Sequence, residues 1–185
     1  MHLEAGAFAP DFATQDIFGN VIRLEDFRGK TLLLSYFRNA ACAICNLRVH
    51  QMIQRYATWK EHGLEVLAVF ESPDESMRQY VAKQDAPFPL IADPQALLYK
   101  LYGVESSEDK VNITTQMAET EGMIESAAEA GFNLTREEGS NFYRIPADFL
   151  IGPDLRLKKA HYGEFVYDHM SFDEIEQLAG LTVVK

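Results

Sequence analysis

The stretch that decides the fold is TLLLSYFRNAACAICNLR, residues 31–48, in which an apolar run leads directly into two cysteines. The run itself, residues 31–37, is too short for a helix that ends there and fits a strand buried on both faces. Apolar residues from Cys45 to Tyr56 then recur at helical spacing, and Gly63 stands where a C-terminal cap is expected. The stretch therefore predicts a buried strand followed by a helix, with both cysteines at their junction.

The pattern of a short apolar run followed by a helical segment occurs twice more, at LEVLAVF (residues 64–70) and FPLIAD (residues 88–93). Helical connections between buried strands imply parallel crossovers. Two hairpins are also predicted, one at the Gly19-Asn20 turn and one around Gly152-Pro153-Asp154. Together these elements predict a single α/β domain over residues 1–185, with a central mixed sheet flanked by helices and an N-terminal β-hairpin extension.

Residues 105–141 interrupt this alternation. They contain nine acidic and two basic residues, which give the segment −7 of the chain's net charge of −11. Residues on one helical face predict an insertion that is largely one amphipathic helix, with Gly131 near its end: Ile113, Met117, Thr120, Ile124 and Ala127. We expect a solvated helix packed on the domain. A lid, a partner surface or a wider homodimer interface are the alternatives.

The composition limits the classes of partner. A net charge of −11 makes nucleic acid an unexpected one, because like charges repel. No apolar run approaches the ~20 residues that cross a bilayer, so no membrane partner is expected. The N-terminal MHLEAGAFAPDF has no basic region followed by an apolar core, so we expect no cleaved signal and a cytoplasmic protein. No cofactor is expected.

The two cysteines, Cys42 and Cys45, are the only ones in the chain. The N-terminus of a helix stabilises a thiolate, so a thiol there has a lowered pKa. Two cysteines at i and i+3 on one turn are also close enough for a disulfide. Cys45 heads the apolar row and should face inward, whereas Cys42 lies at the helix tip. This placement makes Cys42 the attacking thiolate and Cys45 the resolving thiol.

Two other interpretations of these cysteines compete with a redox pair. A cytosolic cysteine is often only a small buried hydrophobe. A structural zinc site needs about four ligands, and the chain has no second cysteine pair, so no metal is expected. A C-x-x-C pair after a buried strand, in an alternating chain, favours the redox interpretation over both.

The chain resembles the thioredoxin-fold superfamily, in its peroxiredoxin-like branch of AhpC/TSA-type redoxins, over about residues 6–103 and 144–178. The segments that carry the resemblance are APDF (9–12), LEDFRGK (24–30), LLLSYF running into CAIC (32–45), FPLIAD (88–93) and IPADFLIGPD (145–154). The resemblance implies a thioredoxin-like fold and thiol-dependent redox chemistry.

The family patterns match this sequence unevenly. The peroxiredoxin pattern P-x-x-x-T-x-x-C ends on Cys45, but Cys42 stands at its threonine position and Arg38 at its proline position. The distant peroxiredoxin arginine falls at about Pro146. The thioredoxin pattern, a C-x-x-C pair with a cis-proline beside it, is matched by both cysteines and by Pro146, which implies a cis Ile145–Pro146 bond. Helix position thus favours Cys42 as the nucleophile, and the peroxiredoxin pattern favours Cys45.

Two charged residues are candidate supports for the cysteines. The guanidinium of Arg38, close to the motif, would lower the pKa of Cys42 by favouring its charged form. Glu71, at the end of the second core strand, would relay a proton to Cys45, as the buried acid does in thioredoxins. The alternatives are an exposed loop arginine and a solvated carboxylate. Arg144 is a candidate replacement for the missing peroxiredoxin arginine.

Three functions are compatible with these observations. The leading hypothesis is a thiol–disulfide oxidoreductase that acts on a disulfide-bearing protein or a peroxide and is recycled by an external thiol reductant. The second is a thiol peroxidase of the peroxiredoxin type, with antioxidant activity, in which Cys45 or Cys42 attacks the peroxide. The third is a non-catalytic binding module that keeps the fold for its surface and docks through residues 105–141.

Overall fold

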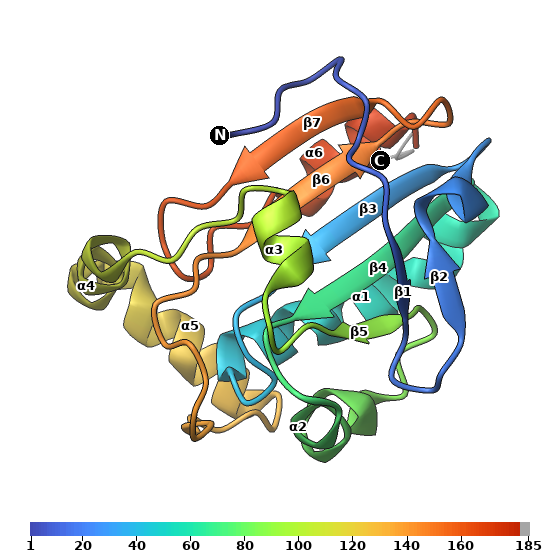
Figure 1. The fold of residues 1–185 in the computed structure, drawn as a ribbon. Helices are drawn as coiled ribbons and strands as arrows, with labels where there is room; N and C mark the ends of the chain where they lie inside the picture. The colour runs from blue at the N-terminus through green and yellow to red at the C-terminus, as the bar shows by residue number, and fades with distance from the viewer. Residues whose placement is uncertain (182–185) are drawn as a thin grey trace.

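A five-stranded mixed sheet forms the centre of the computed structural model, which describes residues 1–181 (Figure 1). Its strand order is β5-β4-β3-β6-β7. The strands are β3 (Thr31–Tyr36), β4 (Leu64–Phe70), β5 (Leu90–Ala92), β6 (Ala147–Ile151) and β7 (Leu157–Tyr162). Strands β3, β4 and β5 pair in parallel, whereas β6 is antiparallel to both of its neighbours, β3 and β7. The predicted α/β fold with a mixed sheet is therefore confirmed.

Strand β3 lies in the middle of the sheet because its sequence is apolar on both faces. All six of its residues are buried. Leu33 packs in one core with helix α1 (Ala43–Glu61) and helix α6 (Phe172–Ala179). Leu32 and Leu34 pack in a second core, on the other face, with helix α3 (Leu97–Leu101). Alternating side chains of one strand thus serve two hydrophobic cores.

The N-terminal hairpin is a separate two-stranded sheet of β1 (Ala13–Gln15) and β2 (Val21–Arg23). Its turn has Gly19 at φ +86°, a left-handed conformation that glycine adopts without steric cost. The Asp16 carboxylate accepts hydrogen bonds from the turn. A 3₁₀ turn, Leu24–Phe27, then leads to β3. The predicted hairpin extension is therefore confirmed.

The acidic insertion differs from its prediction: it forms two helices, α4 (Glu108–Gln116) and α5 (Ala118–Glu129), instead of one. Met117 between them is extended, at φ −77° and ψ 134°. The Thr114 carbonyl near the end of α4 accepts the Met117 N–H at 3.1 Å and the Thr120 hydroxyl at 2.5 Å. Gly131 follows α5 as expected, at φ +93°.

Figure 1 shows where these elements meet. Helix α1 begins at the end of the sheet to which the arrows of β3 and β4 point, and α4 and α5 lie beyond the same end. Helix α2 (Asp74–Gln79), with a 3₁₀ turn at Val81–Gln84, follows β4. Of the helices in residues 1–181, none has both the length and the apolar character that a membrane span requires.

Candidate redox site

The two cysteines form a disulfide at the start of α1. Cys42 is the N-cap residue, and its sulfur accepts a hydrogen bond of 3.3 Å from the Cys45 backbone N–H. The two Cα atoms are 5.2 Å apart, within the range that a disulfide requires. Cys42 is half-buried, while Cys45 is only 2% exposed and belongs to the core beneath α1. A partner molecule can therefore reach Cys42 but not Cys45.

The loop before the disulfide is held by side chains from other segments. The Ala40 N–H donates to the Ser72 hydroxyl at 2.8 Å. The Asn46 amide donates to the carbonyls of Ala40 and Cys42, at 2.8 and 3.0 Å. Gln84 in turn donates to the Asn46 side-chain oxygen. These bonds fix the backbone around Cys42 without taking part in the covalent chemistry.

Cys42 opens onto a cavity of about 910 Å³ that the insertion helps to enclose. The lining comes from three places. They are the loop and first turn of α1 (Arg38, Asn39, Cys42, Ala43, Ile44), the two insertion helices (Val111, Thr114, Thr115, Thr120, Ile124), and later segments (Leu134–Glu137, Ser140–Tyr143, Val166). Its volume lies within the roughly 300–1,000 Å³ of small-molecule sites. The insertion therefore forms a wall of the redox site.

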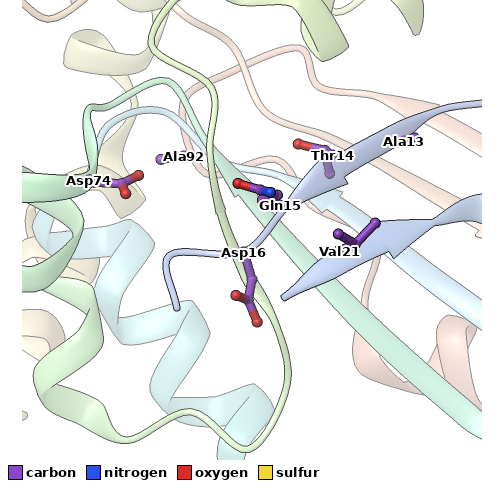
Figure 2. Close-up of a pocket in the computed structure, with 7 residues that line it drawn as sticks. All are labelled: Ala13, Thr14, Gln15, Asp16, Val21, Asp74 and Ala92. Atoms are coloured by element: carbon purple, nitrogen blue, oxygen red, sulfur yellow. The ribbon is translucent and has the colours of Figure 1, made fainter. Parts of the chain in front are cut away.

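A second hollow, of about 460 Å³, lies between the N-terminal hairpin, β5 and α2 (Figure 2). Its lining includes Thr14, Gln15, Asp16 and Asp74. It contains no cysteine and shares no residue with the cavity at Cys42. The disulfide therefore lies at the cavity of about 910 Å³ and not at this hollow.

Arg38 lines the same cavity as Cys42, so the structure brings these two predicted residues together. Its side chain is buried instead of exposed in a loop. Nε donates to the Arg144 carbonyl at 3.0 Å and Nη2 to the Phe142 carbonyl at 2.5 Å. Burial lowers the pKa of Arg38 to about 10, which still leaves it charged at neutral pH. Its role toward Cys42 stays a prediction.

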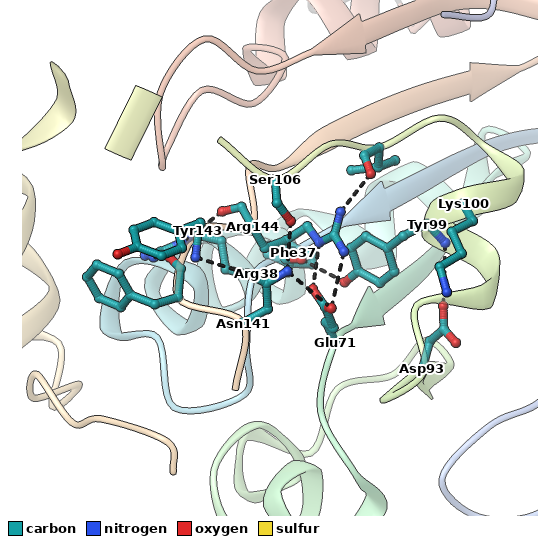
Figure 3. A network of polar contacts seen from close by, with 12 residues as sticks. Phe37, Arg38, Glu71, Asp93, Tyr99, Lys100, Ser106, Asn141, Tyr143 and Arg144 are labelled. Carbon is teal, nitrogen blue, oxygen red and sulfur yellow. Dashed lines mark hydrogen bonds and ion pairs between the residues drawn. The ribbon is translucent and has the colours of Figure 1, made fainter. Parts of the chain in front are cut away.

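Glu71 is bonded to Arg144 rather than to a cysteine (Figure 3). Arg144 donates to both carboxylate oxygens, from Nε at 2.5 Å and from Nη2 at 3.1 Å. Asn141 donates to the same carboxylate at 3.4 Å, and Arg144 also donates to the Val104 carbonyl. This geometry does not favour the predicted proton relay from Glu71 to Cys45. It also directs Arg144 away from the role of a peroxiredoxin arginine.

The expectation of a cis Ile145–Pro146 bond is wrong, because residues 1–181 contain no cis peptide bond. The trans form is the default for an X–Pro bond. The Ile145 N–H bonds the Glu105 carbonyl, and the Pro146 carbonyl accepts from the Gly163 N–H at 2.9 Å. Pro146 is buried, and the lining of the cavity at Cys42 does not include it. Its predicted place in the catalytic site therefore has no support from this geometry.

Two residues that sequence reasoning missed meet at the start of α1. Ser72 is fully buried, and its hydroxyl donates to the Glu137 carboxylate at 2.9 Å. Glu137 also accepts from the Ala41 N–H at 3.4 Å and lines the cavity. Ser72 begins a Ser-Pro-Asp-Glu pattern typical of a helix cap, and Glu137 is one acid among nine in the insertion. Neither pattern indicates that they meet beside Cys42.

A buried polar cluster beneath α1 was also missed. Asp148 on β6 is fully buried and bonded to Ser35 at 2.5 Å and to His169 at 3.0 Å. Arg48, one turn after Cys45, lies 4.0 Å from the same carboxylate. Burial alone would raise the pKa of Asp148, but His169, Arg48 and the Ser35 hydrogen bond together hold it well below its usual range. The cluster ties α1 to the sheet.

Comparison with known proteins agrees with this geometry. Residues 5–160 match the model of the AhpC/TSA family. The thiol-disulfide oxidoreductase ResA of Bacillus thuringiensis is 32% identical over 103 residues, which are 55% of this chain and 59% of that relative. The match therefore spans less than two thirds of the relative's length.

Two solved structures show the fold. Peroxidoxin BcpB from Mycobacterium tuberculosis has a TM-score of 0.67 at 16% identity, over 100% of this chain and 99% of that chain. The thioredoxin domain of a thiol-disulfide oxidoreductase from Bacteroides vulgatus has a TM-score of 0.55 at 17% identity, over 96% and 99%. The predicted thioredoxin-like fold is thereby confirmed.

Proposed function

Since this chain belongs to the AhpC/TSA family, we propose that it is a thiol–disulfide oxidoreductase whose redox couple is Cys42 and Cys45. The observation that carries the proposal is the unequal exposure of the two bonded cysteines. Cys42 lines the cavity, and Cys45 is buried behind it. A disulfide at a helix N-terminus with one accessible sulfur is suited to exchange with other thiols and disulfides.

The exchange takes two steps in the reduced protein. The Cys42 thiolate attacks one sulfur of a substrate disulfide, which forms a mixed disulfide and releases the first substrate thiol. The Cys45 thiol then loses its proton and attacks the Cys42 sulfur, which closes the Cys42–Cys45 disulfide and releases the second thiol. The protein loses two electrons and two protons, and the substrate gains both. An external thiol reductant reverses the change.

The site supports each step. The helix N-terminus favours a negative charge on Cys42, and the charged Arg38 lines the same cavity. The proximity of the two cysteines on one helical turn makes the second step intramolecular. The relative ResA is named for the same activity, which favours disulfide exchange over the peroxidase and binding-module alternatives. The cytoplasmic location, the homodimer and the antioxidant activity stay predictions.

Trapping the mixed disulfide tests this assignment. In the Cys45→Ser variant, one half of a model disulfide should stay bound to Cys42 as a mixed disulfide, while the other half is released as a thiol. Mass spectrometry of the intact protein should show the bound half as an added mass. With Cys42→Ser, we expect no adduct and a loss of exchange by orders of magnitude. The wild-type protein should end two hydrogens lighter. An adduct that forms on Cys45 at the wild-type rate in Cys42→Ser would reverse the roles of the two cysteines.

A further inference from the structure

The cavity at Cys42 combines apolar walls with a positive charge, in a chain whose net charge is −11. Its apolar walls come from Val111, Ile124, Leu134, Phe142 and Val166. Its charged lining residues are Arg38, Arg136 and Glu137. The local balance of charge is thus opposite in sign to that of the whole protein.

Arg38 is the buried one of the two arginines, and no carboxylate in residues 1–181 forms an ion pair with it. Its two hydrogen bonds go to neutral backbone carbonyls. The Glu71 carboxylate forms an ion pair with Arg144. The Glu137 carboxylate accepts hydrogen bonds from the Ser72 hydroxyl and the Ala41 N–H. A buried charge without a counter-ion is costly, so an anion that enters the cavity would gain a strong interaction.

The neighbouring Asn39 is a second buried polar residue at the cavity. Its side chain is 7% exposed, and its Oδ1 is buried without a hydrogen-bond partner in the described part of the chain. Asn39 also lines the cavity. Buried acceptors are usually satisfied.

The guanidinium is also held in a fixed position. The carbonyls of Phe142 and Arg144 accept its hydrogen bonds, and both residues follow directly after the insertion. The Glu71–Arg144 ion pair anchors this segment beside the end of β4 (Figure 3). The Phe142 ring lies 5.3 Å from the guanidinium carbon of Arg38. An arginine fixed in this way is suited to bind a carboxylate, because less side-chain entropy is lost on binding.

We propose that the cavity binds a low-molecular-mass disulfide that carries a carboxylate, with the carboxylate on Arg38 and the sulfur–sulfur bond at Cys42. This inference rests on the proposed function and specifies its substrate class. The substrate's first sulfur bonds to Cys42 and its second leaves as a thiol. Attack by Cys45 on the Cys42 sulfur then releases the carboxylate-bearing thiol. In the net reaction, the hydrogens of the Cys42 and Cys45 thiols are transferred to the two product thiols.

A competing role for Arg38 has a different signature. If the guanidinium only stabilised the Cys42 thiolate, its removal would slow the reaction with every disulfide by the same factor. If it binds the substrate carboxylate, its removal selectively slows carboxylate-bearing substrates. The ratio of rate constants for a charged and a neutral disulfide therefore separates the two roles.

The test uses the full reduced chain with two disulfides of similar size, dithiodipropionate and the neutral bis(hydroxypropyl) disulfide. Second-order rate constants come from acid quenching and mass spectrometry of the intact protein. Dithiothreitol serves as the free-thiol reference. Its own rate constants give the ratio of the charged to the neutral disulfide that is expected without a binding site. For the wild-type protein we expect this ratio to exceed that of dithiothreitol by about tenfold or more, because a charge-assisted hydrogen bond is lost with the neutral substrate.

Variants at the arginine sharpen the result. Arg38→Gln should lower the ratio by about tenfold, and Arg38→Lys should restore part of it. Circular dichroism shows whether each variant is folded. If a variant is not folded, the comparison of the wild-type ratio with that of dithiothreitol still tests the inference. A wild-type ratio no higher than that of dithiothreitol would overturn the inference and leave the proposed function intact. A protein that reacts with neither disulfide faster than dithiothreitol does would overturn both.

Discussion

The central sheet with helix α1 and the acidic insertion differ in how much of each is buried. Every residue of β3 and β6 is buried, and the core of α1 includes Cys45, Val49, Met52 and Trp59. Helix α4 buries only Val111 and Thr114, and α5 buries only Ala127. The two regions touch where Ala127 packs against Ala43 and Leu47 of α1.

This difference suggests a division of labour. The sheet and α1 hold the two cysteines at the start of a helix, which gives them their chemistry. The insertion has little core of its own, so it is expected to open more easily than the sheet. It contributes a wall of the cavity, and the Phe142 carbonyl that accepts from Arg38 follows directly after it. We therefore expect the insertion to act on what reaches Cys42 and, through Glu137, on the charge beside it.

The largest effect is expected in the sheet. Asp148→Ala removes the buried carboxylate that faces Arg48 and is hydrogen-bonded to Ser35 and His169, and should lower the free energy of unfolding by about 3–5 kcal/mol. Urea denaturation followed by circular dichroism measures it. The matched control is Glu125→Ala, an exposed acid on α5, with an expected effect within about 0.5 kcal/mol. Equal effects of the two substitutions would remove the energetic difference between the regions.

The same aspartate predicts a pH dependence. The pKa of Asp148 in the folded protein lies below its unfolded value, which is about 3.9. Its contribution to stability is therefore complete above about pH 4 and is lost as the pH falls toward the folded pKa. Acid titration of the unfolding free energy should show a steeper loss in the wild type than in Asp148→Asn. Parallel curves would exclude this contribution.

A smaller effect is expected where the insertion ends. Glu71→Ala leaves the buried Arg144 guanidinium without its carboxylate and should cost about 2 kcal/mol. It should also lower the preference for carboxylate-bearing disulfides, because Arg38 donates to the Arg144 carbonyl. Glu71→Gln keeps one hydrogen-bond acceptor and is the milder control. Full stability together with an unchanged preference would show that this ion pair does not support the site.

The smallest effect concerns Glu137. Its carboxylate accepts from the Ala41 N–H next to Cys42, and a like charge disfavours a thiolate. Glu137→Gln keeps the hydrogen-bonding shape and should speed alkylation of reduced Cys42 by neutral iodoacetamide at pH 6. The expected gain is roughly two- to fivefold, or ~0.5–1 kcal/mol. The adjacent, exposed Glu138→Gln should change little, and a slower reaction in Glu137→Gln would contradict the electrostatic argument.

The local sequence was enough to predict the elements whose cause is local. The apolar run of residues 31–37 predicted β3, and the helical spacing after Cys45 predicted α1. The Gly19-Asn20 turn predicted the first hairpin. The charge of residues 105–141 predicted the insertion. The break between α4 and α5 was not predicted, because Met117 and Thr120 also fit a continuous helical pattern. The resemblance to thioredoxins suggested a cis bond before Pro146, which the structure does not have.

The sequence was enough to predict a redox pair, because two cysteines lie three residues apart at the junction of a buried strand and a helix. The surroundings of the two cysteines, by contrast, follow from how distant segments pack together. Glu71 was paired with Arg144 across 73 positions, Ser72 with Glu137 across 65, and Arg38 with the Arg144 carbonyl across 106. Helices and turns depend on neighbours within a few residues, and their patterns are visible along the chain. Charge pairing and the shape of a cavity depend on which distant segments the fold brings together.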